Sequence, residues 1–417
     1  MNEFYNYALE IAKRAKAVSL EIASKGTKEK NALLEFIAEN IEKNSNYIIQ
    51  ENKKDIEFAK NAGKQKAFID RLILDEKKIK SLKNAILDIV ALPDPVGSGN
   101  LITKRPNGLK IEKIRVPIGV IAMIYESRPN VTSDSAALCL KSGNTVILRG
   151  GKEAINSNKA IANVIKDGLK KMNFPEDAVI LIENLEYQVV DELLKMNEYI
   201  DLVIPRGGES LIKSVTEKST IPVIKHDKGV CHVFIDASAD KTKAENIVIN
   251  AKCQKPSVCN AMETLLIHKE YPYVKELIKK LLDNYVTVVA DKNIRNIFPE
   301  LEEVKEEDFY KEYLDYKLNA KIVENVEEAV NHINKYGSHH SDSIISESYH
   351  NVQYFLERVD SAAVYANAST RFTDGGEFGL GAEMGISTQK LHVRGPMGLE
   401  GLTTEKWIIY GDGHIRE

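Results

Sequence analysis

The sequence predicts an α/β protein organised around a doubly wound, parallel sheet. Between residues 116 and 235, short apolar runs alternate with longer segments of helical periodicity, which is the pattern of successive βαβ units. The first run, residues 116–124, is apolar throughout, as a strand covered on both faces requires. With 43% hydrophobic and 28% charged residues, the 417 residues suffice for a large core divided over two or three domains.

Two predicted regions precede this sheet. Residues 1–92 predict successive amphipathic helices, because apolar residues recur on one helical face with lysines and glutamates opposite. Residues 98–115 predict a β-hairpin, since Asn107-Gly108 stands between two β-prone runs whose alternation slips at Glu112-Lys113. An isolated two-stranded hairpin is only marginally stable in water, so we expect this one to pack on another subunit or domain.

The elements of the α/β region follow in order. We expect strands at residues 116–124, 145–148, 178–182, 202–204, 222–224 and 232–235, with helices at 133–143, 155–171, 190–196 and 209–218. A helix at 244–253 and a strand at 263–268 begin a second α/β segment, and a strand at 405–410 closes the chain. In such sheets the ligand site lies at the carboxyl ends of the strands.

Cys259 follows Pro256, which cannot continue a helix, and precedes the strand at 263–268. A side chain at such a helix-to-strand corner can be held rigidly and still be reached from a cleft. The Cys259 thiol is therefore a candidate nucleophile toward carbonyl carbon, provided that its pKa is lowered. The alternative is a small buried hydrophobe.

Composition excludes several other classes of protein. Cys139 and Cys231 are expected in the core, and Cys253 is expected to be a packing residue. No paired spacing of zinc ligands occurs, so no metal is expected. No signal peptide and no apolar run near the ~18 residues of a membrane span are present, which favours a cytoplasmic chain without a membrane partner. The net charge of −4 argues against nucleic acid and permits phosphate-bearing small ligands.

The ends of the first, second and fourth predicted strands combine cations with glycine or polar residues: Tyr125–Asn130, Arg149–Lys152 and Arg206–Ser210. Glycine beside arginine, opening onto a helix amino terminus, suits phosphate, because backbone amides approach closely and the helix end is electropositive. The three together predict a nucleotide site, although no G-x-G-x-x-G follows any strand. A glycine-rich segment at 375–398 predicts a loop that wraps a ligand.

Five segments occur in a recognisable order: Val116-Pro-Ile-Gly-Val-Ile, Arg128-Pro-Asn130, Lys141 to Arg149, Pro256-Ser-Val-Cys259-Asn-Ala, and Glu377-Phe-Gly-Leu-Gly to Arg394-Gly-Pro-Met-Gly. Over essentially the whole chain they resemble the γ-glutamyl phosphate reductases, also called glutamate-5-semialdehyde dehydrogenases. This family belongs to the aldehyde dehydrogenase superfamily.

The resemblance implies an aldehyde-dehydrogenase-like fold with three domains. A Rossmann-type domain, residues 1–97 and 116–252, would bind NADPH, and an α/β catalytic domain would span residues 253–393. A β-ribbon flap, residues 98–115 and 394–417, would join the hairpin to the C-terminal strand and serve oligomerisation. A homo-oligomer, dimer or tetramer, is expected.

The resemblance also implies the reaction. It is the NADPH-dependent reduction of L-glutamate 5-phosphate to L-glutamate 5-semialdehyde and phosphate through a cysteine thioester, the second step of proline biosynthesis from glutamate. Glutamate 5-kinase is a further expected partner, because it would hand over the labile acyl phosphate.

Site residues follow from the resemblance by position. Cys259 matches the nucleophile, and its amide together with Asn130 would stabilise the oxyanion. Residues expected at the substrate or its phosphate are Arg128, His226, Lys228, Phe378, Gly379 and Arg394. Residues expected at the cofactor are Arg149, Lys152, Arg206, Gly207, Gly208 and Glu312.

Two of the residues expected at the cofactor correspond to particular residues of other aldehyde dehydrogenases. Arg149 stands where other aldehyde dehydrogenases place a lysine on the adenine ribose, and a cation there with Lys152 nearby suits a 2′-phosphate. Glu312 is matched to the superfamily's carboxylate at the nicotinamide ribose.

One departure separates this chain from hydrolytic aldehyde dehydrogenases. Those enzymes carry a Glu-Leu-Gly-Gly segment whose glutamate activates water, whereas this chain has Lys225-His226-Asp227-Lys228-Gly229. Loss of the glutamate fits a reductase that keeps water from its thioester. The alternatives are a hydrolytic NAD(P)-linked aldehyde dehydrogenase of the same fold and a non-catalytic member that binds nucleotide only.

Overall fold

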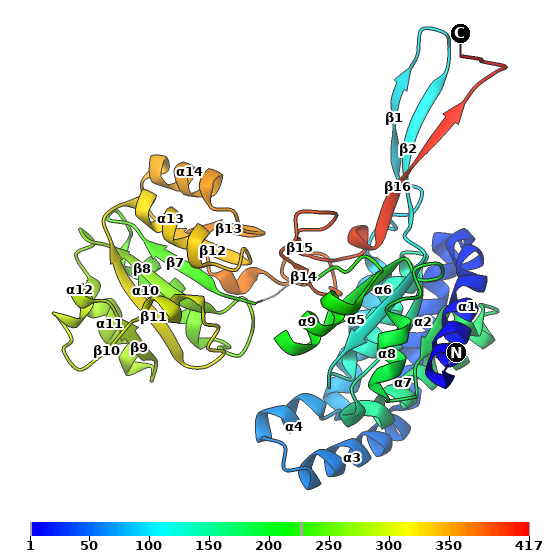
Figure 1. The fold of residues 1–417 in the computed structure, drawn as a ribbon, viewed down its shortest axis with the longest axis horizontal. Helices are drawn as coiled ribbons and strands as arrows, with labels where there is room; N and C mark the ends of the chain where they lie inside the picture. The colour runs from blue at the N-terminus through cyan, green and yellow to red at the C-terminus, as the bar shows by residue number, and fades with distance from the viewer. Residues whose placement is uncertain (1, 226–227, 417) are drawn as a thin grey trace. The chain divides into compact units, whose positions relative to one another are not determined.

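The computed structural model describes residues 2–225 and 228–416, which form two compact units (Figure 1). The first unit comprises Met1–Lys225, Gly379–Gly385 and Met397–Glu417, and the second comprises His226–Phe378 and Ile386–Pro396. None of the helices among the described residues has the length and apolar character needed to cross a bilayer.

The first unit is built on a four-stranded parallel sheet in the order β5-β4-β3-β6. Its strands are β3 (Val120–Tyr125), β4 (Thr145–Arg149), β5 (Val179–Leu181) and β6 (Leu202–Arg206). Its helices are α1 (Glu3–Ser24), α2 (Thr27–Lys43), α3 (Ser45–Asn61), α4 (Lys66–Leu72), α5 (Glu76–Ala91), α6 (Asn130–Lys141), α7 (Ile155–Lys171), α8 (Tyr187–Leu193) and α9 (Glu209–Lys218). The predicted run of amphipathic helices and the alternation of strands and helices that follows it are confirmed.

A buried carboxylate ties the N-terminal helices to this sheet. Asp55 of α3 accepts hydrogen bonds from the main-chain N–H groups of Asn156 (3.1 Å) and Ser157 (2.8 Å) at the start of α7. These are N–H groups that the first turn of a helix leaves without an internal partner. The start of α7 directly follows Arg149 and Lys152 in the chain, so Asp55 helps to fix the end of the sheet where they lie.

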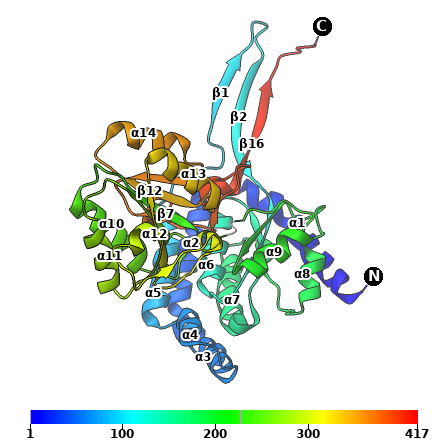
Figure 2. The ribbon, with the colours of Figure 1, turned by 60° about the vertical axis from the view of Figure 1, so that its left-hand side comes forward.

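The predicted hairpin is confirmed and gains a third strand. β1 (Gly99–Lys104) and β2 (Lys110–Pro117) pair antiparallel, and β16 (Thr403–Tyr410) pairs with the other edge of β2. Both ribbon views show these strands side by side (Figures 1 and 2). The register shifts between Leu101 and Thr103, not at Glu112-Lys113 as the alternation suggested.

The apolar run at 116–124 is two strands, not one. β2 ends at Pro117 and β3 begins at Val120, with Gly119 between them at φ 129°. A side chain there would be strained, and a Cβ would also collide with the Asp201 carboxylate. The chain therefore turns from the antiparallel sheet into the parallel sheet at Gly119.

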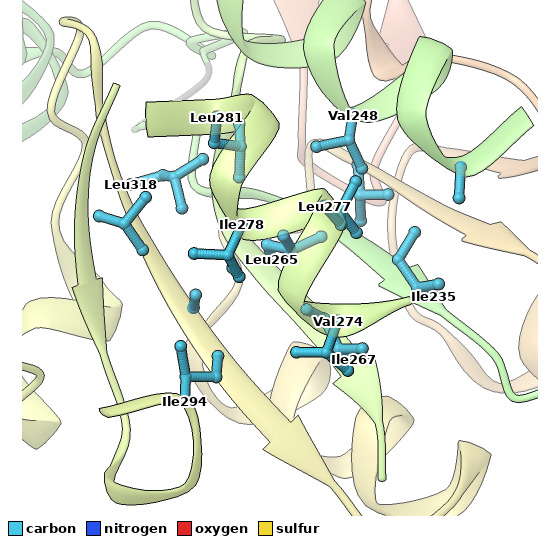
Figure 3. Close-up of a cluster of buried hydrophobic side chains, with 14 of the residues drawn as sticks. Ile235, Val248, Leu265, Ile267, Val274, Leu277, Ile278, Leu281, Ile294 and Leu318 are labelled. Atoms are coloured by element: carbon cyan, nitrogen blue, oxygen red, sulfur yellow. The ribbon is translucent and has the colours of Figure 1, made fainter. Parts of the chain in front are cut away.

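The second unit holds a seven-stranded parallel sheet in the order β10-β9-β11-β8-β7-β12-β13. Its strands are β7 (Cys231–Ile235), β8 (Met262–His268), β9 (Thr287–Ala290), β10 (Glu302–Glu303), β11 (Lys317–Val323), β12 (Ser341–Ile345) and β13 (Ala363–Ala366). The helices are α10 (Lys241–Cys253), α11 (Val274–Asp283), α12 (Lys292–Arg295), α13 (Val326–Tyr336) and α14 (Tyr349–Arg358), and a small ribbon pairs β14 (Ile386–Ser387) with β15 (Gly395–Pro396). Side chains of α10 and α11 pack on the strands in one apolar cluster (Figure 3).

The prediction of strands at 222–224 and 232–235 in the first sheet is wrong. Residues 222–224 form only an isolated bridge between Val203 and Val223. β7 lies in the second sheet, because it pairs with β8 on one side and β12 on the other. Residues 228–252 therefore lie in the second unit, and the expected division of the chain into three domains stays a prediction.

A buried histidine makes the stability of the second unit depend on pH. The His332 ring packs against Phe309 and Tyr336, with ring centroids 4.6 and 4.5 Å away. Within the described residues, its Nε2 has no hydrogen-bond partner. Burial lowers the pKa of His332 from 6.5 to about 2. The folded ring stays neutral, whereas the unfolded chain takes up a proton as the pH falls below 6.5, and this favours unfolding.

We expect His332 to remove about 1.4 kcal/mol of the unfolding free energy of the second unit per pH unit between roughly pH 6 and pH 3. His332→Phe should flatten the profile, because the replacement cannot take up a proton when unfolded. Urea denaturation monitored by hydrogen exchange in β11 and β12 would measure the slope. His350→Phe, at an exposed position of α14, is the matched control and should keep the wild-type slope. An unaltered slope in His332→Phe would contradict the assignment.

Candidate active site

Cys259 lies where the sequence places it, at the corner between α10 and β8, and it is half-buried. The main chain around it is held by long-range contacts. The Asn260 side chain donates to the carbonyl oxygen of Thr373 (2.8 Å), and the Thr370 hydroxyl donates to the carbonyl oxygen of Asn260 (2.7 Å). The Cys231 thiol donates to the carbonyl oxygen of Cys259 (3.2 Å). The corner is therefore a fixed platform for the thiol.

Gly229 packs directly on this corner. A Cβ atom at this position would collide with the carbonyl group of Cys259, so only glycine permits the approach. The Gly229 N–H donates to the Glu312 carboxylate at 3.0 Å. Glu312, expected at the nicotinamide ribose, thus lies in the second unit and holds the segment that touches Cys259. Its contact with a cofactor stays a prediction.

The other thiols are disfavoured as nucleophiles. Burial raises the pKa of Cys139, of Cys231 and, less completely, of half-buried Cys253. A thiol whose pKa lies above its usual range carries little thiolate at neutral pH, and the thiolate is the reactive form. The expectation that Cys139 and Cys231 lie in the core is confirmed, and Cys253, expected as a packing residue, is partly buried against the core of the second unit.

A cavity of about 280 Å³ in the first unit lies at the carboxyl ends of β3 and β4. It is lined by Lys64, Phe68, Ile124, Tyr125, Glu126, Ser127, Arg149, Gly151, Lys152, Glu153, Leu185, Tyr187 and Leu211. The structure thus brings Arg149 and Lys152 together in one cavity, at the edge of the sheet where a ligand site was expected.

Arg149 is the buried cation of this cavity. Its guanidinium donates to the carbonyl oxygens of Gly150 (3.0 Å) and Leu185 (2.8 Å) and lies over the Tyr187 ring. Its Nε has no hydrogen-bond partner among the described residues. Burial lowers the pKa of Arg149, although an arginine remains charged at any physiological pH. The cavity thus offers a guanidinium and an aromatic ring, whereas the Nε atom itself is buried.

Lys64 and Tyr187 line the cavity but are not predicted from the sequence. Lys64 of the α3–α4 connection pairs with Glu153 at 3.3 Å, and the Ser127 hydroxyl donates to the same carboxylate at 3.3 Å. Tyr187 begins α8 and is largely exposed. Neither Lys64 nor Tyr187 lies in a motif, and only the folded chain brings them beside Arg149. An anion entering the cavity would meet Arg149 and Lys152, and also the carboxylates of Glu126 and Glu153.

The Arg206-Gly207-Gly208 segment lies at the end of β6 and the start of α9, as expected, but does not line the cavity. The Gly208 N–H donates to the Glu126 carboxylate at 3.0 Å, and Arg206 pairs with Glu383 at 3.4 Å. Glu126 thus occupies the helix amino end where a phosphate was expected, and a phosphate there would have to displace it. The cofactor role of Arg206, Gly207 and Gly208 stays a prediction.

Arg128 and Asn130 are exposed in the segment that leads from β3 into α6. The Asn130 side-chain amide donates one hydrogen bond to Asp134 at 2.9 Å, which orients the amide and leaves its second N–H for another acceptor. Burial raises the pKa of Asp134 to about 6. The geometry is compatible with an oxyanion donor at Asn130, and this role stays a prediction.

The remaining substrate candidates differ in how far they are already engaged. Lys228 is half-buried, and His226 lies outside the described residues. Phe378 is exposed, and Gly379 adopts φ 74°, a conformation that favours glycine. Arg394 pairs with the Asp360 carboxylate at 2.8 Å, so its charge is compensated within the second unit. Their contact with substrate stays a prediction.

Comparison with known proteins assigns the family. Residues 2–296 match the aldehyde dehydrogenase family. The chain is 52% identical to gamma-glutamyl phosphate reductase of Clostridium botulinum (strain Eklund 17B / Type B), covering 97% of this chain and 98% of the relative. It is 51% identical to the enzyme of that name from Aquifex aeolicus (strain VF5), covering 99% and 97%. The chain belongs to the γ-glutamyl phosphate reductase family.

Solved structures agree with this assignment. The crystal structure of gamma-glutamyl phosphate reductase from Thermotoga maritima is 45% identical and has a TM-score of 0.96, covering 98% of this chain and 100% of the other. The aldehyde-dehydrogenase-like α/β fold and the resemblance to γ-glutamyl phosphate reductases are therefore confirmed. The aldehyde dehydrogenase family uses an NAD(P) nucleotide and a small-molecule substrate, so the expected nucleotide is confirmed at that level.

Proposed function

We propose that this chain reduces L-glutamate 5-phosphate to L-glutamate 5-semialdehyde and phosphate, with NADPH as reductant, in the second step of proline biosynthesis from glutamate. The observation that carries the proposal is the half-buried Cys259, fixed at a corner of a γ-glutamyl phosphate reductase fold. Relatives about half identical over nearly the full chain carry that enzyme's name.

Cys259 performs the covalent step. Its thiolate attacks the 5-carbonyl carbon and forms the C–S bond, and the bond from that carbon to the phosphate oxygen breaks with its electron pair on phosphate. The product is a thioester on Cys259, whose carbonyl carbon accepts a hydride more readily than a carboxylate would. After hydride addition the C–S bond breaks, and the aldehyde leaves while the thiolate is restored.

Two negative charges develop in this sequence and need donors. The Cys259 backbone amide and the second N–H of Asn130 would stabilise the oxyanion, which is usually the largest electrostatic contribution in acyl transfer. Arg128, Lys228 and His226 are the candidates for the departing phosphate, because all are cationic or can become so. Phe378, Gly379 and Arg394 would complete the substrate site.

The cofactor supplies the hydride when bound. Arg149 and Lys152 would hold the adenosine end in the cavity of the first unit, with Lys64 at its edge. Arg149 and Lys152 at one cavity suit a 2′-phosphate, which supports NADPH over NADH, whereas the charge of Lys64 is compensated by Glu153. Arg206, Gly207, Gly208 and Glu312 remain proposed cofactor contacts on the basis of the family resemblance.

The domain roles follow from this assignment. The first unit would bind the nucleotide, and the second would carry the catalytic thiol. The sheet of β1, β2 and β16 exposes apolar side chains at Leu101, Ile102, Trp407 and Ile409, which supports its role as an oligomerisation flap in a dimer or tetramer. We also propose a cytoplasmic location and glutamate 5-kinase as the supplier of the labile acyl phosphate.

The test runs the reaction backwards, because the acyl phosphate is labile. Pyrroline-5-carboxylate, in equilibrium with the semialdehyde, is mixed with enzyme and NADP⁺, and NADPH absorbance is followed with phosphate or with sulfate of equal ionic strength. We expect NADPH to form with phosphate alone, since the thioester requires phosphate as acceptor. With phosphate present, NADP⁺ should exceed NAD⁺ in kcat/KM by roughly 10- to 100-fold, as one or two charge-assisted hydrogen bonds would give.

The other outcomes separate the rival functions. Equal rates in phosphate and sulfate would establish a water-using aldehyde dehydrogenase and refute the interpretation of residues 225–229. Nucleotide binding without NADPH formation in either buffer would favour a member of the fold that binds nucleotide only.

A further inference from the structure

We propose that Arg371 is a positioning residue for Cys259: its guanidinium joins the two ends of the loop that carries the thiol and supplies a positive charge beside it. The proposal rests on the proposed role of Cys259 as nucleophile. Arg371 lies in the short 3-10 helix Thr370–Phe372, far from Cys259 in the sequence.

The contacts of Arg371 span the loop of Cys259. The guanidinium Nε donates to the side-chain oxygen of Gln254 at 2.9 Å, and Nη1 donates to the side-chain oxygen of Asn260. Gln254 follows the last residue of α10, and Asn260 follows Cys259 directly. One planar guanidinium thus bridges the beginning and the end of the loop, which a point charge such as lysine could not do with the same geometry.

The same short helix holds Asn260 from the other side. The Thr370 hydroxyl donates to the Asn260 carbonyl oxygen, and the Asn260 amide donates to the Thr373 carbonyl oxygen. Asn260 therefore has its side chain and its main chain both bonded to residues 370–373. Any displacement of that segment moves the peptide next to Cys259.

The charge of Arg371 acts on the thiol. Both hydrogen bonds described above go to neutral amide oxygens, so neither cancels the charge. Burial lowers the pKa of Arg371. Nearby negative charges oppose this lowering, and the Cys259 thiolate makes the largest contribution, followed by Asp374, Cys231 and Glu377. Because the attraction between two charges is mutual, the guanidinium favours the thiolate form of Cys259 by the same interaction.

This arrangement gives Cys259 what a nucleophilic cysteine needs. Reactive cysteines lie next to a cation and are partly accessible, whereas inert ones are buried without one. Cys259 is half-buried beside Arg371, while Cys139 and Cys231 are buried. Asp374 and Glu377 face the same guanidinium and weaken its effect, so the expected lowering of the thiol pKa is moderate.

The experiment measures the reactivity of Cys259 without substrate or nucleotide. The full chain is alkylated with iodoacetamide between pH 5 and pH 10, and mass spectrometry follows the peptide that contains Cys259. Arg371→Gln keeps a hydrogen-bond donor and removes the charge, so we expect the midpoint of the alkylation profile to rise by about one pH unit. Arg371→Lys keeps the charge and should stay near the wild-type midpoint. Arg358→Gln, at an exposed position of α14, should leave the midpoint unchanged.

An unchanged midpoint in folded Arg371→Gln would overturn the proposal, and so would a rise in Arg371→Lys as large as that in Arg371→Gln. If Arg371→Gln does not fold, the proposal is tested with Arg371→Lys alone. An alkylation midpoint of this variant near ~8.5, the pKa of a free thiol, would show that the charge has no effect and would overturn the proposal. The readout needs no turnover. It therefore stays informative if the reverse reaction fails and the proposed function is wrong.

Discussion

Cys259→Ala should abolish turnover in both directions while leaving nucleotide binding intact. Without the thiol no acyl-enzyme forms, and hydride transfer to an unactivated acyl group is far slower than transfer to a thioester. Loss of a nucleophile that works with its supporting groups as a unit costs several orders of magnitude, so we expect kcat to fall by at least about a thousandfold. Phosphate-dependent formation of NADPH from pyrroline-5-carboxylate measures turnover, and quenching of tyrosine and tryptophan fluorescence by NADPH measures binding.

Cys253→Ala is the matched control, because Cys253 is also half-buried and ends α10, close to Cys259 in the chain. Burial raises the pKa of the Cys253 thiol, which makes it a poor nucleophile. The Cys253→Ala variant should therefore retain most of the wild-type rate. Full activity in Cys259→Ala together with loss of activity in Cys253→Ala would transfer the nucleophile to Cys253. Loss of NADPH binding in Cys259→Ala would indicate a structural role for the thiol instead.

Local patterns in the sequence predict most of the elements. The expected helices at 155–171 and 209–218 coincide with α7 and α9, because their periodicity and their flanking residues are both unambiguous. The failures concern which sheet a strand joins. β7 is as apolar as the strands before it, and only its pairing with β8 and β12 reveals its sheet. Pairing is a tertiary property that no single run of residues encodes.

The residues of the candidate site also divide into those that the sequence predicts and those that only the fold reveals. Cys259 is found from the sequence because a helix, a proline and a strand meet within a short stretch. Arg371 is missed because its partner Asn260 is 111 positions away and no motif joins them. Glu126 is missed for the same reason: its carboxylate lies on the Gly208 amide, where the sequence pattern suggests a phosphate. Sequence patterns indicate which groups are available, and the fold decides which of them are already paired.

Lys252 and Glu263 form an ion pair that is fully buried between α10 and β8, and its disruption should strongly destabilise the second unit. The Lys252 ammonium lies 2.9 Å from the Glu263 carboxylate, and both side chains have no exposed surface. The carboxylate also accepts hydrogen bonds from the backbone N–H groups of Tyr313 and Leu314, which directly follow Glu312. The pair thus holds the segment whose Glu312 carboxylate binds Gly229 beside Cys259.

Lys252→Met should lower the free energy of opening of the second sheet by about 3–5 kcal/mol, because the buried Glu263 carboxyl, without its cation, must either stay charged in the interior or take up a proton. Burial already raises the pKa of Glu263 to about 7, against the opposing attraction of Lys252. Hydrogen exchange of the β8 and β11 amides measures this free energy, with β3 of the first unit as the internal reference. Lys243→Met, at an exposed ion pair with Glu347, should change it little.

The double variant Lys252→Met/Glu263→Gln distinguishes a buried charge from lost packing. Glutamine has nearly the shape of glutamate, still accepts the N–H of Leu314, and carries no charge. If the cost of Lys252→Met comes from the stranded carboxylate, the second substitution should restore a large part of the lost stability, since a neutral buried pair avoids the desolvation penalty. If the double variant is as unstable as Lys252→Met alone, the cost lies in the packing of the lysine side chain, and the ion pair is not what holds the Glu312 segment against Gly229.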